Sequence, residues 1–144
     1  MNTIIELSTT LLKLVEQWLK PAVMLIVRIF IAYAFFKSGL LKIKDWDSTL
    51  FLFEYEYVIP FVPHMIAAVM GAIGELVLPV LLAVGFGARI GALGLIIMTL
   101  VIEIFIYPGT QEHYYWMSIL ALLAMTGPGA ISVDHLIRRR VVAS

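Results

Sequence analysis

Two ionisable side chains lie in apolar segments where a charge is costly. Arg28 lies in LIVRIFIAYAFF, residues 25–36, and Glu75 lies in GAIGELVLPVLL, residues 71–82. If these segments cross a bilayer, each charge costs at least about 2.5–3.5 kcal/mol unless it meets a partner. Along a helix, Arg28 would lie about 10 Å from the inner end of its segment and Glu75 roughly 13 Å from that of its own. The matched depths predict a buried ion pair between Arg28 and Glu75.

A second group of side chains could bind the headgroup of a small lipid-soluble molecule. Glu103 is an acid in an otherwise uncharged apolar segment, so it is costly unless it is paired or solvated. His113 returns to a similar depth after the short turn PGTQE, and Lys42 lies on the inward face of its helix. Together they could hydrogen-bond a quinone carbonyl and pass a proton. We expect Phe35 and Tyr114 to line this site; the alternative is a solvated Lys42–Glu103 salt bridge.

Other redox and metal chemistry finds little support in the sequence. The chain has no cysteine, which excludes disulfides, thiolate metal sites and the usual ligands of an iron–sulfur cluster. His64, His113 and His135 fall near helix ends, whereas a haem that bridges two helices needs deeper histidines. Glu103, Glu112 and His113 could form a metal site near the outer surface. A role as interfacial polar residues is simpler, so we predict no metal, and the zero net charge suggests no nucleic-acid partner.

The elements that position these residues are predicted to be transmembrane helices. Of the 144 residues, 62% are hydrophobic and 14% are charged, and the mean hydropathy is +1.00. That is too apolar for the surface of a soluble domain. Four segments approach the roughly 20 apolar residues of a bilayer span, namely 21–43, 65–84, 90–107 and 114–131. We expect an all-α integral membrane protein, a four-transmembrane-helix bundle forming one domain over residues 21–137.

The first twenty residues are expected to form an amphipathic helix in the membrane interface. Apolar residues recur on one face at three- and four-residue steps. They are Ile4, Leu7, Leu11, Val15 and Trp18. The charges of this segment and the absence of an A-x-A-type cleavage site argue against a removable signal peptide. A flexible tail is the alternative interpretation.

The placement of basic residues predicts the orientation of the chain. Lys13 and Lys20 precede the first span, Arg89 lies between the second and third, and a basic tail at 138–144 follows the fourth. The side of the membrane with more basic residues should be cytoplasmic, so both termini are expected in the cytoplasm. The aromatic segment 45–63 would then be an outer loop at the opposite membrane interface.

A glycine–proline–glycine stretch at 127–129 is predicted to stop the fourth helix. Glycine supplies left-handed backbone geometry, and proline removes a hydrogen-bond donor. Ser132 and Asp134 can then cap or start a short inner helix that ends in three arginines.

Several of these segments together carry a resemblance to a known family. The arginine of the first helix is followed by FFKSGLLK (35–42). The second helix is GAIGELVLPVLLAVGFGAR (71–89), with a central glutamate, a late glycine and a closing arginine, and the last match is GPGAISVDHLI (127–137). In this order and spacing the chain resembles the DoxX family of small four-helix bacterial membrane proteins, over roughly residues 21 to 137.

The resemblance implies a protein of the bacterial inner membrane. Some relatives are described as membrane subunits of a thiosulfate:quinone oxidoreductase or as members of a membrane oxidoreductase complex, and many have no established activity. We therefore expect a subunit or partner of a membrane oxidoreductase system that binds a quinone or another lipid-soluble molecule. The alternative is a non-enzymatic assembly factor or a small transporter. Partner subunits and a homo-oligomer both fit the resemblance.

Overall fold

The computed structural model describes residues 2–143, and every regular element in that range is helical. The elements are α1 (Asn2–Leu14), the π-helical turn η1 (Val15–Leu19), α2 (Lys20–Lys44), α3 (Trp46–Tyr55), α4 (His64–Val84), α5 (Ala88–Phe105), α6 (Gln111–Thr126) and α7 (Val133–Ala143). Within residues 2–143, three helices are long and apolar enough to cross a membrane: the continuous helix that ends at Lys44, α4 and α5. The prediction of an all-α membrane protein is confirmed.

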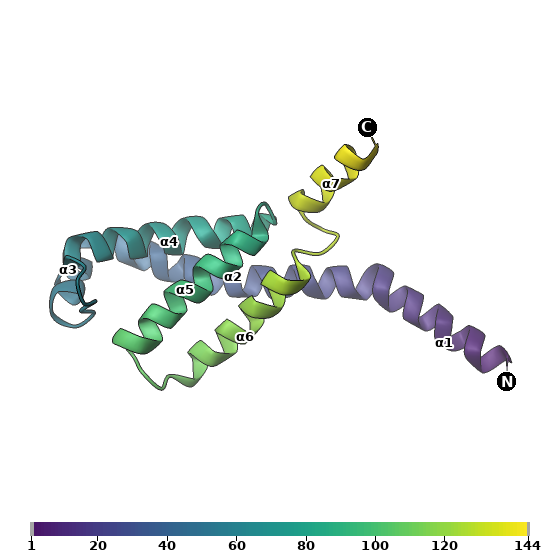
Figure 1. The fold of residues 1–144 in the computed structure, drawn as a ribbon, viewed down its shortest axis with the longest axis horizontal. Coiled ribbons are helices and arrows are strands. Elements are labelled where there is room, and N and C mark those ends of the chain that lie inside the picture. Colours follow the sequence, from purple (N-terminus) through teal and green to yellow (C-terminus); the bar gives the residue numbers. More distant parts are fainter. Residues whose placement is uncertain (1, 144) are drawn as a thin grey trace.

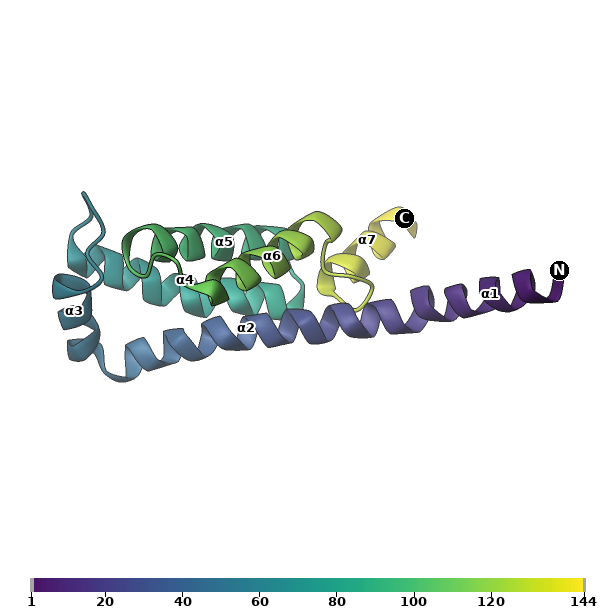
Figure 2. The same ribbon diagram turned by 90° about the horizontal axis from the view of Figure 1, so that it is seen from below.

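The N-terminal segment and the first span form one continuous helical rod. Figures 1 and 2 show α1 continuing into α2 without a gap, with a bend visible in Figure 1, and extending well beyond the bundle. At the junction, the backbone N–H of Lys20 donates to Val15 O, five residues back, as in a π-helix. No break occurs near residue 20, where the sequence predicts a boundary. Trp18 and Leu11 are exposed on this rod, whereas the side chains of Ile4 and Leu7 lie outside the described part.

Antiparallel packing of α2, α4, α5 and α6 forms the bundle (Figure 2). The apolar core between these helices includes Ile31, Leu82, Leu95 and Leu120, all with no exposed surface. α2 and α4 approach each other closely at Gly39, where an added Cβ would lie 3.0 Å from the Cβ of Glu75. A glycine at this position lets the two helices meet almost backbone to backbone.

The expected outer loop at 45–63 contains a helix, α3, that the sequence did not predict. Asp45 caps its start: Oδ1 accepts from Ser48 N at 3.1 Å, and Oδ2 accepts from Ser48 Oγ at 2.7 Å. Because these hydrogen bonds favour the ionised carboxylate, the pKa of Asp45 lies below its usual range. The helix is anchored by Phe53, which packs against Ala67 and Ala68 of α4.

At the opposite end of the bundle, the chain stops and restarts as the sequence predicts. α6 ends before Gly127, whose φ of 81° requires the left-handed region that glycine tolerates. Ser132 then caps α7, because its Oγ accepts from His135 N at 3.2 Å. The segment expected to be a basic tail is helical as far as Ala143.

Candidate functional site

Arg28 is buried, but the prediction that it pairs with Glu75 is wrong. Its guanidinium, 1% exposed, donates to three backbone carbonyls. Nη2 lies 3.0 Å from Ala83 O and 2.9 Å from Ile131 O, and Nη1 donates to Pro128 O. The acid whose charge acts on this guanidinium is Asp134.

The error has a simple geometric cause. The prediction assumes that the helical segment of Arg28 starts at the membrane boundary. In the structure α2 begins well before the bundle does. Arg28 lies level with Ala83, one residue before the end of α4, and therefore at the end of the bundle where α4 turns into α5. A guanidinium there satisfies the free carbonyls of a helix end and is far less costly than one in hydrocarbon.

Asp134 holds the start of α5, a role that the sequence interpretation missed. Its Oδ1 accepts from Gly87 N at 2.9 Å and its Oδ2 from Ala88 N at 3.2 Å. Its own N–H donates to Gly85 O at 2.9 Å. The residue that caps α7 is Ser132. The two predicted capping residues, Ser132 and Asp134, therefore serve different helices. Arg28 and Asp134 together tie the C-terminal segment to the α4–α5 turn.

Glu75 pairs with Lys42 where α2 and α4 contact each other. Lys42 Nζ lies 2.7 Å from Glu75 Oε2 and 3.0 Å from Ser38 Oγ. The side chains are 18% and 5% exposed, so the pair is largely withdrawn from solvent. Lys42 was expected beside Glu103, and the structure gives it a different acid. The close approach at Gly39 brings the two helices near enough for this contact.

Glu103, His113 and Tyr114 meet where α5 and α6 face each other. His113 Nδ1 lies 2.7 Å from Glu103 Oε2, and Tyr114 donates its hydroxyl to Glu103 Oε1 at 2.8 Å. The N–H of Gly109, in the turn between the helices, also donates to Oε1 at 2.6 Å. The structure thus brings together three of the five residues of the expected ligand site.

Phe35 reaches this cluster through an aromatic side chain that the sequence analysis did not single out. Its ring lies 5.3 Å from that of Trp116, and the Trp116 ring lies 5.7 Å from the imidazole of His113, centroid to centroid. Trp116 follows His113 by three residues and so lies on the same face of α6. That helical spacing was a signal that could have identified it.

The hydrogen bonds of the cluster determine what His113 can do chemically. An ionised carboxylate only accepts hydrogen bonds. With Glu103 ionised, Nδ1 of His113 therefore carries the hydrogen and donates a hydrogen bond to Glu103. In neutral imidazole, Nε2 then bears the free lone pair. Nε2 makes no hydrogen bond to any residue that the structure describes. It can therefore accept a hydrogen bond or a proton from a bound molecule. No group of three or more His, Cys, Asp or Glu side chains within residues 2–143 could hold a metal ion.

A pair of tyrosine hydroxyls lies at the same end of the bundle. Tyr107, which follows α5, donates to the hydroxyl of Tyr57 at 3.2 Å. Burial and this hydrogen bond raise the pKa of Tyr57 well above its ordinary value. Tyr57 therefore stays protonated, and it links the segment after α3 to the end of α5.

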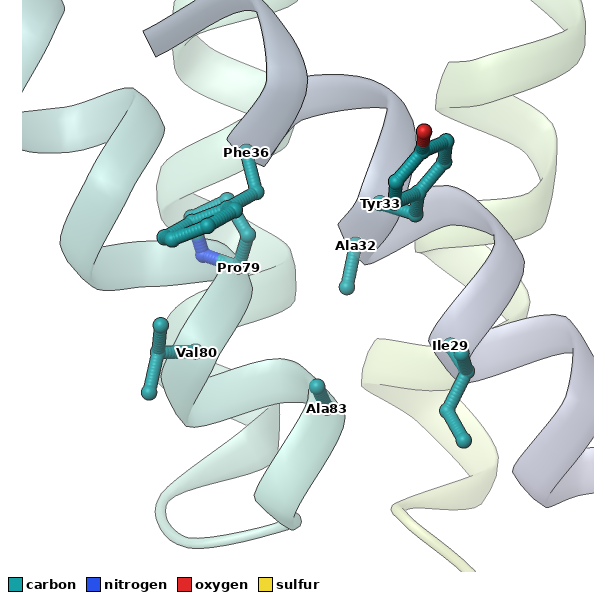
Figure 3. A pocket seen from close by; sticks show the side chains of 7 residues that line it. All are labelled: Ile29, Ala32, Tyr33, Phe36, Pro79, Val80 and Ala83. Atoms are coloured by element: carbon teal, nitrogen blue, oxygen red, sulfur yellow. The ribbon is translucent and has the colours of Figure 1, made fainter. Parts of the chain in front are cut away.

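An apolar groove lies elsewhere, between α2 and α4 (Figure 3). Its volume is about 200 Å³. The lining residues are Ile29, Ala32, Tyr33, Phe36, Pro79, Val80 and Ala83. None of the five residues of the expected ligand site lines it. The groove is smaller than the roughly 300 Å³ at which ordinary ligand pockets begin.

The fold and the apolar helices define a small, helical, multi-pass membrane protein. The family model that matches the chain is DoxX, over residues 23–108, which extend from α2 into the turn after α5. The chain belongs to the DoxX family. Inner membrane protein YphA of Escherichia coli (strain K12) is 30% identical, over 81% of this chain and 91% of that protein. No solved structure matches the chain.

Proposed function

We propose that this protein is a membrane subunit or partner of an oxidoreductase system, and that it binds a quinone or a similar lipid-soluble molecule. The headgroup would lie at the Glu103–His113–Tyr114 cluster, against the rings of Phe35 and Trp116. The observation that carries the proposal is the geometry of His113. Its Nδ1 is fixed by a buried carboxylate, and its Nε2 is left available.

Burying an ionisable side chain in a membrane helix costs free energy. Glu103 is 8% exposed and His113 is 6% exposed, within an apolar helical bundle. An acid in a membrane helix usually marks a ligand, ion or proton site. Here three donors hold the carboxylate in place. The carboxylate in turn keeps the imidazole in one orientation and one tautomer. Such an arrangement resembles a positioned general base more closely than a loose surface salt bridge.

The test measures the affinity of a short-chain quinone analogue for the protein in mild detergent. Trp116 is the reporter, in a background where Trp18 and Trp46 are replaced by Phe, because its ring lies beside His113. We expect His113→Ala and Glu103→Gln to weaken binding at least tenfold, which corresponds to about 1.4 kcal/mol. The matched controls are His64→Ala and Tyr115→Phe, both at exposed positions. If both site variants fold and bind as the wild type does, the proposal fails.

The topology that we propose has four spans and both termini in the cytoplasm. The 16 residues of α6 would extend about 24 Å, short for a span. A membrane crossing by α6 is nevertheless supported, because α6 packs beside α5 along its length. Glu103 meets His113 at one end, and Arg89 Nη2 lies 3.5 Å from Met125 O at the other.

Figure 1 shows α1 and α7 leaving the same end of the bundle. Tags at both termini should be inaccessible to proteases in intact spheroplasts and digested after lysis.

A second candidate is a non-enzymatic role, as an assembly factor or a small transporter. The observation that favours it is the Lys42–Glu75 pair, which places two largely buried charges at the α2–α4 contact, where they could line a path. A protein that is purified without a bound small molecule and ignores quinone analogues would favour this role.

A further inference from the structure

The C-terminal helix α7 is an exposed element with a fixed starting point. Asp134, in its first turn, bonds the backbone of Gly85, Gly87 and Ala88. Those residues form the turn between α4 and α5, both of which are long and apolar enough to cross a membrane. Lipid-exposed irregular backbone does not occur in the hydrocarbon layer, so a turn between two spans lies at the bilayer boundary. The first turn of α7 is therefore held at that boundary.

The composition of α7 suits such a place. Leu136 and Ile137 are 59% and 45% exposed, and both lie on the same side of the helix as Val133 at steps of about 100° per residue. Three consecutive arginines, Arg138 to Arg140, are also exposed. Apolar side chains combined with several arginines on one helix are typical of helices that lie in a membrane interface.

We propose that α7 is a membrane-surface helix that binds anionic phospholipid headgroups of the leaflet at its end of the bundle. The apolar side chains enter the boundary between headgroups and acyl chains, and the arginines contact lipid phosphates. Eleven residues extend about 16 Å, so a helix anchored at its first turn stays within reach of the surface. The occupant is a lipid surface because the anchor holds α7 at the bilayer boundary. This proposal does not depend on the quinone site.

The experiment compares the whole protein in two kinds of nanodisc, one of zwitterionic phosphatidylcholine and one with about a third phosphatidylglycerol. Amide hydrogen exchange is followed over residues 133–143. We expect exchange in α7 to slow by about tenfold or more in the anionic discs, and the difference to shrink at high salt. Exchange in α3, at the other end, should be the same in both.

Two triple variants complete the design. Replacing Arg138, Arg139 and Arg140 by Gln should abolish the lipid dependence and leave the bundle folded. The control replaces Lys13, Lys37 and Lys44 by Gln, which removes the same charge elsewhere in the chain. Equal exchange of α7 in the two nanodiscs would overturn the proposal, as would a dependence that survives loss of the arginines. Protection by an added acidic protein, with none from lipid, would also overturn it.

Discussion

Lys42 of α2 and Glu75 of α4 form an ion pair of 2.7 Å at the place where Gly39 lets the two helices touch. Each charge lies where solvent hardly reaches, so each depends on the other. The pair joins α2 to α4. Its position is determined by the helix contact and not by the counted depth of either residue.

We predict that breaking this pair destabilises the protein. Glu75→Gln or Lys42→Met should each lower the free energy of unfolding by about 3 kcal/mol, because the remaining charge is left without its partner. The double variant Lys42→Met/Glu75→Leu should recover most of that loss, since neither charge remains. Thermal unfolding in detergent measures both. Lys37→Met, at an exposed position of the same helix, is the control, and equal losses in it and in Lys42→Met would contradict the prediction.

The guanidinium of Arg28 is predicted to hold the segment between α6 and α7. Arg28→Lys keeps the charge but not the planar fork that reaches three carbonyls. We expect faster amide exchange over residues 127–134 in this variant, with little change in α3. The matched control is Arg89→Lys, because the one long contact of Arg89 with a carbonyl, at 3.5 Å, lies on an exposed surface. Unchanged exchange in Arg28→Lys would show that the fork is dispensable.

Asp134 is predicted to stabilise α5 from a distance of almost fifty residues in sequence. Asp134→Ala removes the acceptor of two backbone N–H groups at the start of α5 and should cost about 1 kcal/mol of stability. Asp134→Asn retains one acceptor oxygen and should cost less. Thermal melting in detergent ranks the variants, and a smaller loss in Asp134→Ala than in Asp134→Asn would refute this capping role.

The start of α3 is predicted to respond to acid. Hydrogen bonds from Ser48 lower the pKa of Asp45 in the folded state. The stabilisation is therefore complete above the ordinary aspartate pKa of about 3.9, and it is lost as the pH falls through the lower folded value. The fluorescence of Trp46, in a Trp18→Phe/Trp116→Phe background, should change in that acid range. Asp45→Asn should remove the transition, and its persistence would assign it to another group.

Helix positions and inward faces could be predicted from sequence, whereas partners across the bundle could not. Arg28, Phe35 and Gly39 all lie on the buried side of α2, as steps of 100° indicate. The meeting of Glu103 with His113 followed from the short turn between their helices. The partner of Glu75 depended on how far α2 slides past α4. A count of residues within one helix carries no information about that offset.

Contacts between distant segments were also beyond prediction. The cap that Asp134 provides for α5 depends on the path of residues 127–132 around the end of the bundle. From the local sequence alone, Asp134 could equally well have capped α7. Trp116 differs in this respect, because the three-residue step from His113 was visible in the sequence.

The π-helical turn Val15–Leu19 shifts the angular phase of the rod. A π turn holds about one residue more than an α turn, and each residue turns an α-helix by about 100°. The backbone of α1 is therefore rotated by about 100° about the helix axis, relative to α2, from where an unbroken α-helix would place it. The apolar stripe that regular spacing assigns to Leu11 and Trp18 is divided at this turn. Deleting one residue there would restore the phase and turn the thirteen residues of α1 toward a different side of the bundle.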